Sequence, residues 1–137
     1  MGKVLRDIWI LTQSGITVFS RVIDPRINPQ IFGALMSALN TYAEKLTDGG
    51  ISNFEVKKIR FVIIRRKRFL FVANASSKVK TQKILNELSI MSDKFFNTYS
   101  EEVLENWDND VSIFEDFESH ISDSLEEIAE KFQKGFW

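Results

Sequence analysis

The chain of 137 residues has 44% hydrophobic side chains, enough to build the core of one globular domain and to exclude a disordered tail. Cysteine is absent, which excludes disulfides, thiolate metal sites and cysteine nucleophiles. No apolar run reaches the roughly 18 residues that a membrane span needs, and no signal-peptide pattern opens the chain. We therefore expect a cytoplasmic protein that contacts a membrane at its periphery at most.

The charges are unevenly distributed, although the net charge is only −1. Residues 1–100 hold 16 Lys and Arg against 7 Asp and Glu, whereas residues 101–137 hold 2 against 12. Such asymmetry predicts either an internal electrostatic match or two surfaces with different partners.

Two β-rich segments at residues 4–12 and 16–23 flank the turn sequence Gln13-Ser14-Gly15. We expect them to form a β-hairpin, with the glycine supplying a positive φ in the turn. Asp24-Pro25 ends the second segment.

A helix is expected to begin at Asn28-Pro29, with asparagine as the N-cap and proline in the first helical position. It runs to Asp48 and stops at Gly49-Gly50. Its apolar stripe follows the helical spacing and consists of Ile31, Leu35, Ala38, Leu39, Tyr42 and Leu46. We expect the aromatic residues of such stripes, here Tyr42, to lie in the core.

Three further strands are expected at residues 51–58, 60–64 and 69–75. The first is polar and carries lysines, which is typical of a strand at a sheet edge. The other two contain the unbroken apolar runs Phe61-Val62-Ile63-Ile64 and Phe69-Leu70-Phe71-Val72. Because successive side chains of a strand point to opposite faces, such runs predict a sheet that helices cover on both faces.

A long helical pattern spans residues 78–107, with a kink expected near Ser100, and Asp108-Asn109-Asp110 breaks it. A last helix follows, with Ser112 and Glu115 spaced as a capping box. Its apolar stripe consists of Phe114, Phe117, Ile121, Leu125, Ile128 and Phe132. The predicted order is β-β-α-β-β-β-α-α, with one helix on one face of the sheet and two on the other.

The sequence contains no constellation typical of catalysis or metal binding. The single histidine, His120, lies in an acidic helix where Glu118 and Asp123 lack the spacing of metal ligands. Asp108-Asn109-Asp110 resembles the start of a calcium loop, but Ser119 stands where that loop requires its bidentate glutamate. We therefore expect no enzyme activity, no metal and no cofactor.

The strongest candidate for a contact surface is basic. Four consecutive cations separate the two apolar strands, and three more precede them. The candidate residues are Lys57, Lys58, Arg60, Arg65, Arg66, Lys67 and Arg68. Two interpretations stay open, a solvated hairpin tip or a patch that meets phosphates or anionic lipid head groups. Nucleic acid is not expected, because no solvent-facing aromatic residues alternate with the basic ones and the net charge is not positive.

Several local patterns together resemble a longin domain over about residues 4–132. The patterns are ILTQSGITVF (10–19), Asp24-Pro25, IFGALMSAL (31–39), FLFV (69–72), Trp107-x-x-Asp110 and Phe114-x-x-Phe117. They shape a fold and include no active-site motif. The resemblance implies a single longin-like α+β domain over residues 1–137, a profilin-like three-layer α/β/α sandwich around a five-stranded antiparallel sheet.

The resemblance also implies a function. Longin domains, like the similar roadblock domains, serve as interaction platforms in vesicle-tethering SNAREs, adaptor and coat subunits and exchange factors for small GTPases, and they commonly pair. The chain is similar to stand-alone archaeal longins and lacks the coiled-coil heptads of SNARE longins. We expect a non-catalytic module that binds a small GTPase or another longin or roadblock protein, as a homodimer or heterodimer, in a trafficking-like or GTPase-regulating complex. The alternative is a peripheral membrane adaptor that contacts anionic lipids through the basic hairpin.

Overall fold

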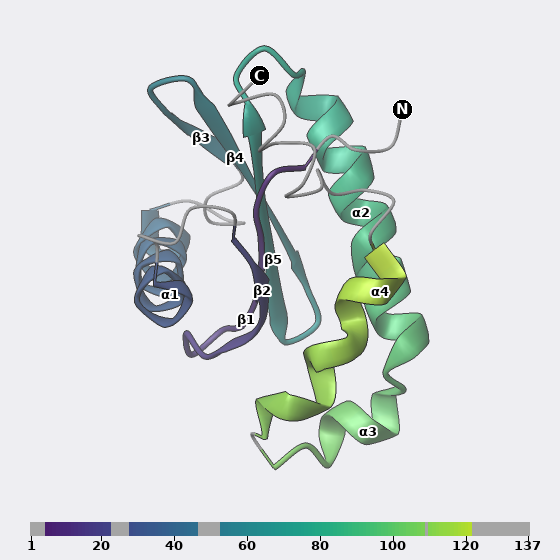
Figure 1. Ribbon diagram of the computed structural model, residues 1–137. Coiled ribbons are helices and arrows are strands. Elements are labelled where there is room, and N and C mark those ends of the chain that lie inside the picture. Colours follow the sequence, from purple (N-terminus) through teal and green to yellow (C-terminus); the bar gives the residue numbers. More distant parts are fainter. Residues whose placement is uncertain (1–4, 23–27, 47–52, 109, 122–137) are drawn as a thin grey trace.

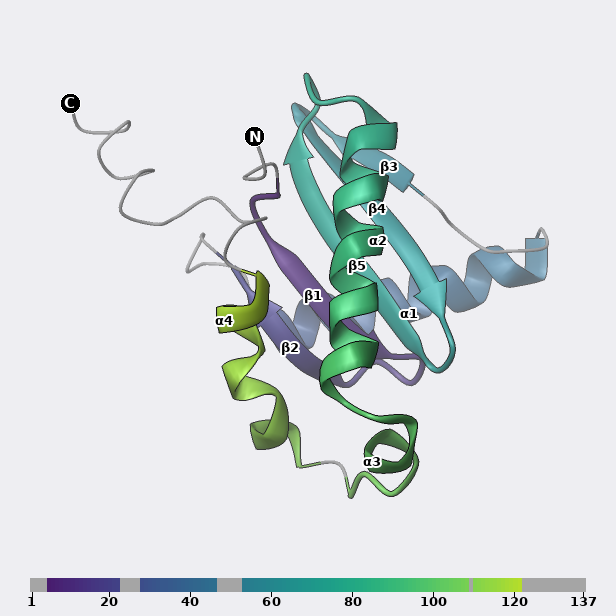
Figure 2. The same ribbon diagram turned by 90° about the vertical axis from the view of Figure 1, so that its right-hand side faces the viewer.

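The computed structural model describes residues 5–22, 28–46, 53–108 and 110–121 (Figure 1). The strands are β1 (Ile8–Thr12), β2 (Thr17–Arg21), β3 (Asn53–Val56), β4 (Ile59–Arg66) and β5 (Phe69–Ser76). The helices are α1 (Pro29–Leu46), α2 (Thr81–Thr98), α3 (Glu101–Glu105), the 3-10 helix η1 (Val111–Phe117) and α4 (Glu118–Ile121). The sheet forms a middle layer, with α1 on one face and α2, η1 and α4 on the other (Figures 1 and 2).

The strand order across the sheet is β2-β1-β5-β4-β3, and every neighbouring pair is antiparallel. β5 therefore lies in the centre, and β2 and β3 form the two edges. This arrangement confirms the predicted α+β class, the five-stranded antiparallel sheet and the edge position of the polar third strand.

The apolar runs of β4 and β5 place side chains on both faces of the sheet, as predicted. Phe71 belongs to the core under α2 and its neighbour Val72 to the core under α1, and both are fully buried. The core under α1 consists of Trp9, Leu11, Met36, Phe61, Ile63, Leu70 and Val72. The larger core under α2 is anchored by helical residues that include Ile84, Leu88, Met91, Phe95, Phe114, Phe117 and Ile121.

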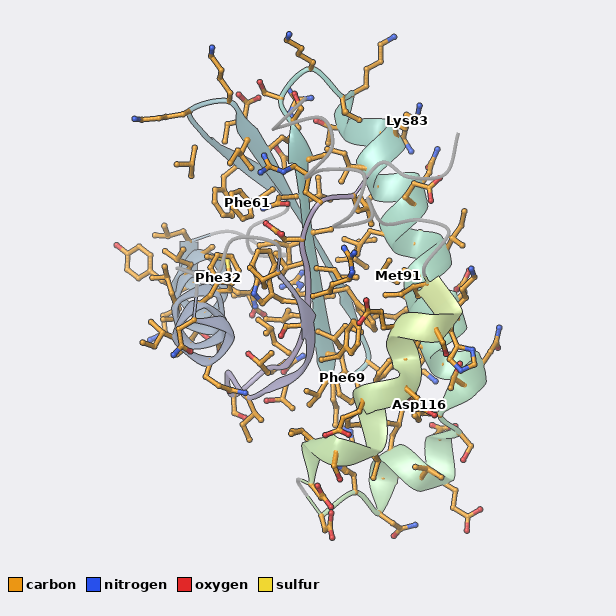
Figure 3. The ribbon with its side chains drawn as sticks, viewed as in Figure 1. Phe32, Phe61, Phe69, Lys83, Met91 and Asp116 are labelled. Atoms are coloured by element: carbon orange, nitrogen blue, oxygen red, sulfur yellow. The ribbon has the colours of Figure 1, made fainter. Side chains whose placement is uncertain are left out.

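Aromatic rings fill much of both cores. Figure 3 shows Phe32 and Phe61 between α1 and the sheet, whereas Met91 and Phe69 lie on the side of α2. The rings of Phe32 and Trp9 stack with their centroids 4.0 Å apart, and those of Phe32 and Phe61 are 5.8 Å apart. Stacking of this kind adds about 0.5–1.5 kcal/mol per pair to the burial of apolar area.

The long helix predicted for residues 78–107 is divided into α2 and α3. Tyr99 and Ser100 between them have extended backbone, so the expected kink is a complete break. The Ser100 hydroxyl accepts a hydrogen bond from the N–H of Val103 at 3.2 Å and caps α3. The Tyr99 ring packs edge-on against Phe114, with 4.9 Å between centroids, which ties the break to the core.

The predicted last helix begins as the 3-10 helix η1. Its N-cap is Asp110, whose carboxylate accepts hydrogen bonds from the N–H and the hydroxyl of Ser112. The prediction that Ser112 and Glu115 form a capping box is therefore wrong, because Asp110 already satisfies the Ser112 amide. The buried members of the predicted stripe are Phe114, Phe117 and Ile121. Its other members, Leu125, Ile128 and Phe132, lie outside the described residues.

α1 begins as predicted. The side-chain carbonyl of Asn28 accepts hydrogen bonds from the N–H groups of Gln30 and Ile31, at 3.0 and 3.2 Å. The helix is described to Leu46, and the predicted stop at Gly49-Gly50 lies outside the described residues.

The first half of α1 lies directly against the β1–β2 hairpin. A Cβ atom on Gly33 would stand only 2.4 Å from the Thr17 Oγ1, so the site has room for glycine alone. The Ser37 hydroxyl donates a hydrogen bond to the Gln13 carbonyl in the hairpin turn. The side-chain amide of Gln30 bonds both the N–H and the carbonyl of Thr17. These contacts fix the rotation of α1 about its own axis.

Phe71→Ala should lower the free energy of unfolding by about 3–5 kcal/mol, because it removes a fully buried ring between the sheet and α2. Denaturant unfolding followed by circular dichroism measures the change. Ile90→Ala, at an exposed position of α2, is the control and should shift stability by less than about 0.5 kcal/mol. A near-neutral Phe71→Ala would contradict a sheet covered on both faces.

Gly33→Ala should destabilise the protein by about 1–3 kcal/mol, because the new Cβ overlaps the Thr17 hydroxyl. Helix propensity alone predicts the opposite sign, a gain of about 1 kcal/mol. Ala34→Gly, at the exposed neighbouring position, should lose only about that 1 kcal/mol. The same unfolding measurement distinguishes the two effects, and a stabilised Gly33→Ala protein would rule out this close approach.

Candidate functional site

The seven basic candidates do not form one patch. Lys57 and Lys58 form the turn between β3 and β4, whereas Lys67 and Arg68 form the turn between β4 and β5. These turns lie at opposite ends of β4, whose eight residues separate them by about 23 Å. The sequence prediction therefore grouped cations that are close in the sequence but that β4 holds far apart.

Two of the arginines within β4 are tied to neighbouring elements. Arg60 donates hydrogen bonds to the Glu55 carboxylate of β3 and to the Val79 carbonyl. Arg65 forms an ion pair with Glu44 of α1 at 3.3 Å. Both side chains therefore link β4 to neighbouring segments, Arg60 to β3 and the Val79 carbonyl and Arg65 to α1.

Arg66, the last residue of β4, faces α2. Its guanidinium pairs with Asp93, donates to the Ser92 hydroxyl at 2.9 Å and lies 5.0 Å from the centre of the Phe96 ring. The Lys67 ammonium lies over the same ring at 4.8 Å. The predicted four-residue tip is therefore a two-residue turn, and its exposed cations are Lys67 and Arg68.

Arg68 lines a cleft of about 320 Å³ between the β1–β2 turn, the β4–β5 turn and the α3 region. Its walls also include the Glu105 carboxylate and the half-buried Trp107 ring. The walls of this cleft therefore carry charges of both signs.

The outer face of α1 carries large apolar side chains that no described residue covers. They are Ile31, Leu35, Leu39, Tyr42 and Leu46, with exposed fractions of 70%, 53%, 38%, 65% and 68%. Spacings of three and four residues place these five side chains, the outer stripe, along one side of the helix. The predicted helical period is therefore correct, but the prediction that Tyr42 lies in the core is wrong.

The inner face of α1 combines two large apolar side chains, Phe32 and Met36, with residues that are small or polar. Its buried residues are Gly33, Met36, Ser37 and Asn40. The Asn40 amide nitrogen donates to Glu44 at 2.7 Å, and its buried Oδ1 has no hydrogen-bond partner among the described residues. A surface helix ordinarily keeps its outer face polar, whereas α1 carries large apolar side chains on its outer face as well as its inner face.

Sequence reasoning missed the outer stripe as a surface, although a signal was present. The inner residues Gly33, Ser37 and Asn40 also repeat at helical spacing, and a mid-helix glycine often marks close packing. That pattern identifies the side of the helix that approaches another element.

Ionisable groups with shifted pKa values serve packing and capping. Burial, followed by the charge and hydrogen bond of Asp116, raises the pKa of Tyr99 to about 12. Hydrogen bonds from the hydroxyl and N–H of Ser112 lower the pKa of Asp110. Within the described ranges, no group of three or more His, Asp or Glu side chains could hold a metal ion. The described helices include none with the length and apolarity to cross a bilayer.

Comparisons with known proteins give one family and one fold. A family model for the first longin domain of FUZ, MON1 and HPS1 matches residues 6–130. The structure is similar to a roadblock/LC7 domain from Streptomyces avermitilis, with a TM-score of 0.53 and 14% identity over 64% of this chain and 78% of that one. It is also similar to Myxococcus xanthus MglB, with a TM-score of 0.55 and 15% identity over 69% and 85% of the two chains. No curated protein gives a significant match. At these identities the two solved structures support the fold alone.

Proposed function

Because the chain belongs to the family of the first longin domain of FUZ, MON1 and HPS1, we propose that it is a non-catalytic protein-interaction module. It pairs through the outer face of α1 with another longin or roadblock domain, either a second copy or a different chain. The resulting complex acts in small-GTPase regulation or membrane traffic, the roles that longin domains suggest.

The apolar outer face of α1 carries this proposal. Full burial of a Leu or Ile side chain stabilises a complex by about 1.5–3 kcal/mol relative to exposure. The outer stripe aligns four such aliphatic side chains and Tyr42 on one helix, over a length of about 22 Å. Contiguous apolar surface of this kind on a soluble domain marks an interaction site.

The shape of the outer stripe favours another domain that presents a helix. Its residues form ridges along an 18-residue helix, and such ridges pack into the grooves of a second helix. Two copies could meet symmetrically, because an apolar stripe is complementary to itself across a two-fold axis. The exposed residues Thr41 and Lys45 flank the stripe and would form a polar rim.

The lipid-binding alternative has less support from the geometry. Arg60, Arg65 and Arg66 already bond to protein groups, and the remaining cations are divided between two distant turns. Contact of anionic lipids with Lys67 and Arg68 stays a prediction, which salt-sensitive liposome binding would test.

Leu35→Asp should weaken pairing by at least about 2 kcal/mol, or about thirtyfold in Kd, because it places a charge within the outer stripe. Ile90→Asp is the matched control, since it is an apolar position of similar exposure on α2 across the sheet. Sedimentation velocity over a range of concentrations measures self-association, and thermal unfolding verifies that both variants fold.

Pairing with a different chain is measured by affinity capture from native extract with identification by mass spectrometry. The proposal is supported if the wild-type protein and the Ile90→Asp variant both capture a longin or roadblock protein and the Leu35→Asp variant does not. A wild-type chain that stays monomeric and captures no such domain, or equal behaviour of the two variants, would contradict pairing through α1.

The GTPase part of the proposal is tested separately. Nucleotide exchange and hydrolysis by candidate small GTPases are measured with and without the paired protein. If no complex forms and neither rate changes, regulation of those GTPases is wrong while pairing through α1 still stands.

A further inference from the structure

The edge strand β2 opens onto a cleft of about 270 Å³. One wall consists of four consecutive strand residues, 17–20, with Gln30 of α1 beside them. The other wall consists of Val111 and Glu115 of η1 and Glu118 of α4. Figure 2 shows β2 and α4 side by side at this edge of the sheet. None of the residues of the outer stripe of α1 lines this cleft.

A side chain already occupies part of the place of a missing neighbouring strand. The Gln30 amide donates from Nε2 to the Thr17 carbonyl and accepts at Oε1 from the Thr17 N–H, both at 3.2 Å. An adjacent antiparallel strand makes the same pair of hydrogen bonds to a residue of an edge strand. Gln30 therefore identifies the open side of β2 as one that binds a peptide group in ladder geometry.

The register extends this pattern to Ser20. Thr17 pairs with Leu11 of β1, and Ser20 pairs with Trp9, across a bulge that adds one residue to β2. Leu11 and Trp9 are two residues apart, so their backbone groups point the same way. Ser20 therefore directs its N–H and carbonyl outward as Thr17 does, and Ser20 is one of the residues that line the cleft.

The far wall of the cleft is acidic. Glu115 is exposed there, and Glu118 forms an ion pair with Arg21 at 3.0 Å. Residues 101–121 contain no Lys or Arg, so no basic side chain of this segment offsets the charge of Glu115. This charge favours an occupant with a basic side chain near Glu115.

We propose that the cleft along β2 is a docking site for an extended segment of a partner protein, which adds to the sheet as a sixth strand. Its backbone pairs with Ser20, and a Lys or Arg side chain of the segment lies beside Glu115. Recognition by strand addition draws affinity from main-chain hydrogen bonds and specificity from such side-chain contacts. The site does not depend on the pairing face of α1.

The test uses the full chain and two synthetic peptides with blocked ends, Thr-Val-Thr-Lys-Thr-Val-Thr and the same sequence with Glu in place of Lys. Amide NMR spectra of the 15N-labelled protein are recorded during titration. Docking predicts that the Ser20 amide signal shifts, that its hydrogen exchange slows, and that the Lys peptide binds more tightly than the Glu peptide.

Two variants separate the backbone and charge contributions. Ser20→Pro removes the outward N–H, a change that an edge strand tolerates, and should weaken binding about fivefold or more. Glu115→Lys should weaken the Lys peptide by about two- to fivefold and strengthen the Glu peptide. Glu102→Lys, an exposed acid of α3 outside the cleft, is the control and should leave both affinities unchanged.

Several outcomes would overturn the proposal. Absence of any shift at residues 17–21 with the Lys peptide would show that Gln30 merely protects the edge from aggregation. Shifts confined to α1, or an unchanged peptide preference in Glu115→Lys, would also contradict it. If the Ser20→Pro variant fails to fold, the peptide affinities of Glu115→Lys and of its control Glu102→Lys still test the proposal. Leu35→Asp should bind the peptide like wild type, which keeps this result independent of pairing through α1.

Discussion

The close approach of α1 to the β1–β2 hairpin determines which side of this helix faces solvent. Gly33 against Thr17, together with the Ser37 hydrogen bond to the hairpin turn, fixes the helix with Gly33 and Ser37 toward the hairpin. The volume beneath it is filled by the large rings of Trp9 and Phe61 from the sheet, together with Phe32 and Met36 of the helix. Since the sheet supplies much of the bulk, Phe32 and Met36 suffice on the inner face of α1, and its other large apolar side chains face outward. The candidate interaction surface is thus a consequence of how the core is packed.

Patterns that depend on alternation or period were readable from the sequence. The unbroken runs 61–64 and 69–72 predicted two covered faces, and the structure has them. The period of α1 was also predicted, but a period gives the spacing of a stripe and not the direction in which the stripe points. The seven cations looked like one cluster because they are close together in the sequence. The two basic turns nevertheless lie at opposite ends of β4, whose eight extended residues hold them about 23 Å apart. The break at Tyr99–Ser100 depends on tertiary packing of the Tyr99 ring. Helical periodicity in the sequence carries no information about such packing, so it predicted a kink and not a break.

Within the described part of the chain, the acidic C-terminal segment is not the main partner of the basic residues of β4. Basic residues of β4 are matched by acids outside the acidic segment, such as Glu44 for Arg65 and Asp93 for Arg66. The acidic η1–α4 region contributes Glu118 to a pair with Arg21 and leaves Glu115 exposed along the β2 edge. Two surfaces of different chemistry follow, an apolar one on α1 and an acidic, backbone-lined one at β2.

The central claim, that another domain covers the outer face of α1, is tested most directly by the reactivity of a single cysteine. The chain contains none, so Ala38→Cys within the outer face and Ser89→Cys on the exposed side of α2 each give one reporter. Each is reacted with a water-soluble maleimide at protein concentrations below and above the range in which the complex forms. We expect the thiol at position 38 to become protected in the complex and the thiol at position 89 to keep its rate. Equal reactivity of both thiols in a complex verified by sedimentation would contradict the claim.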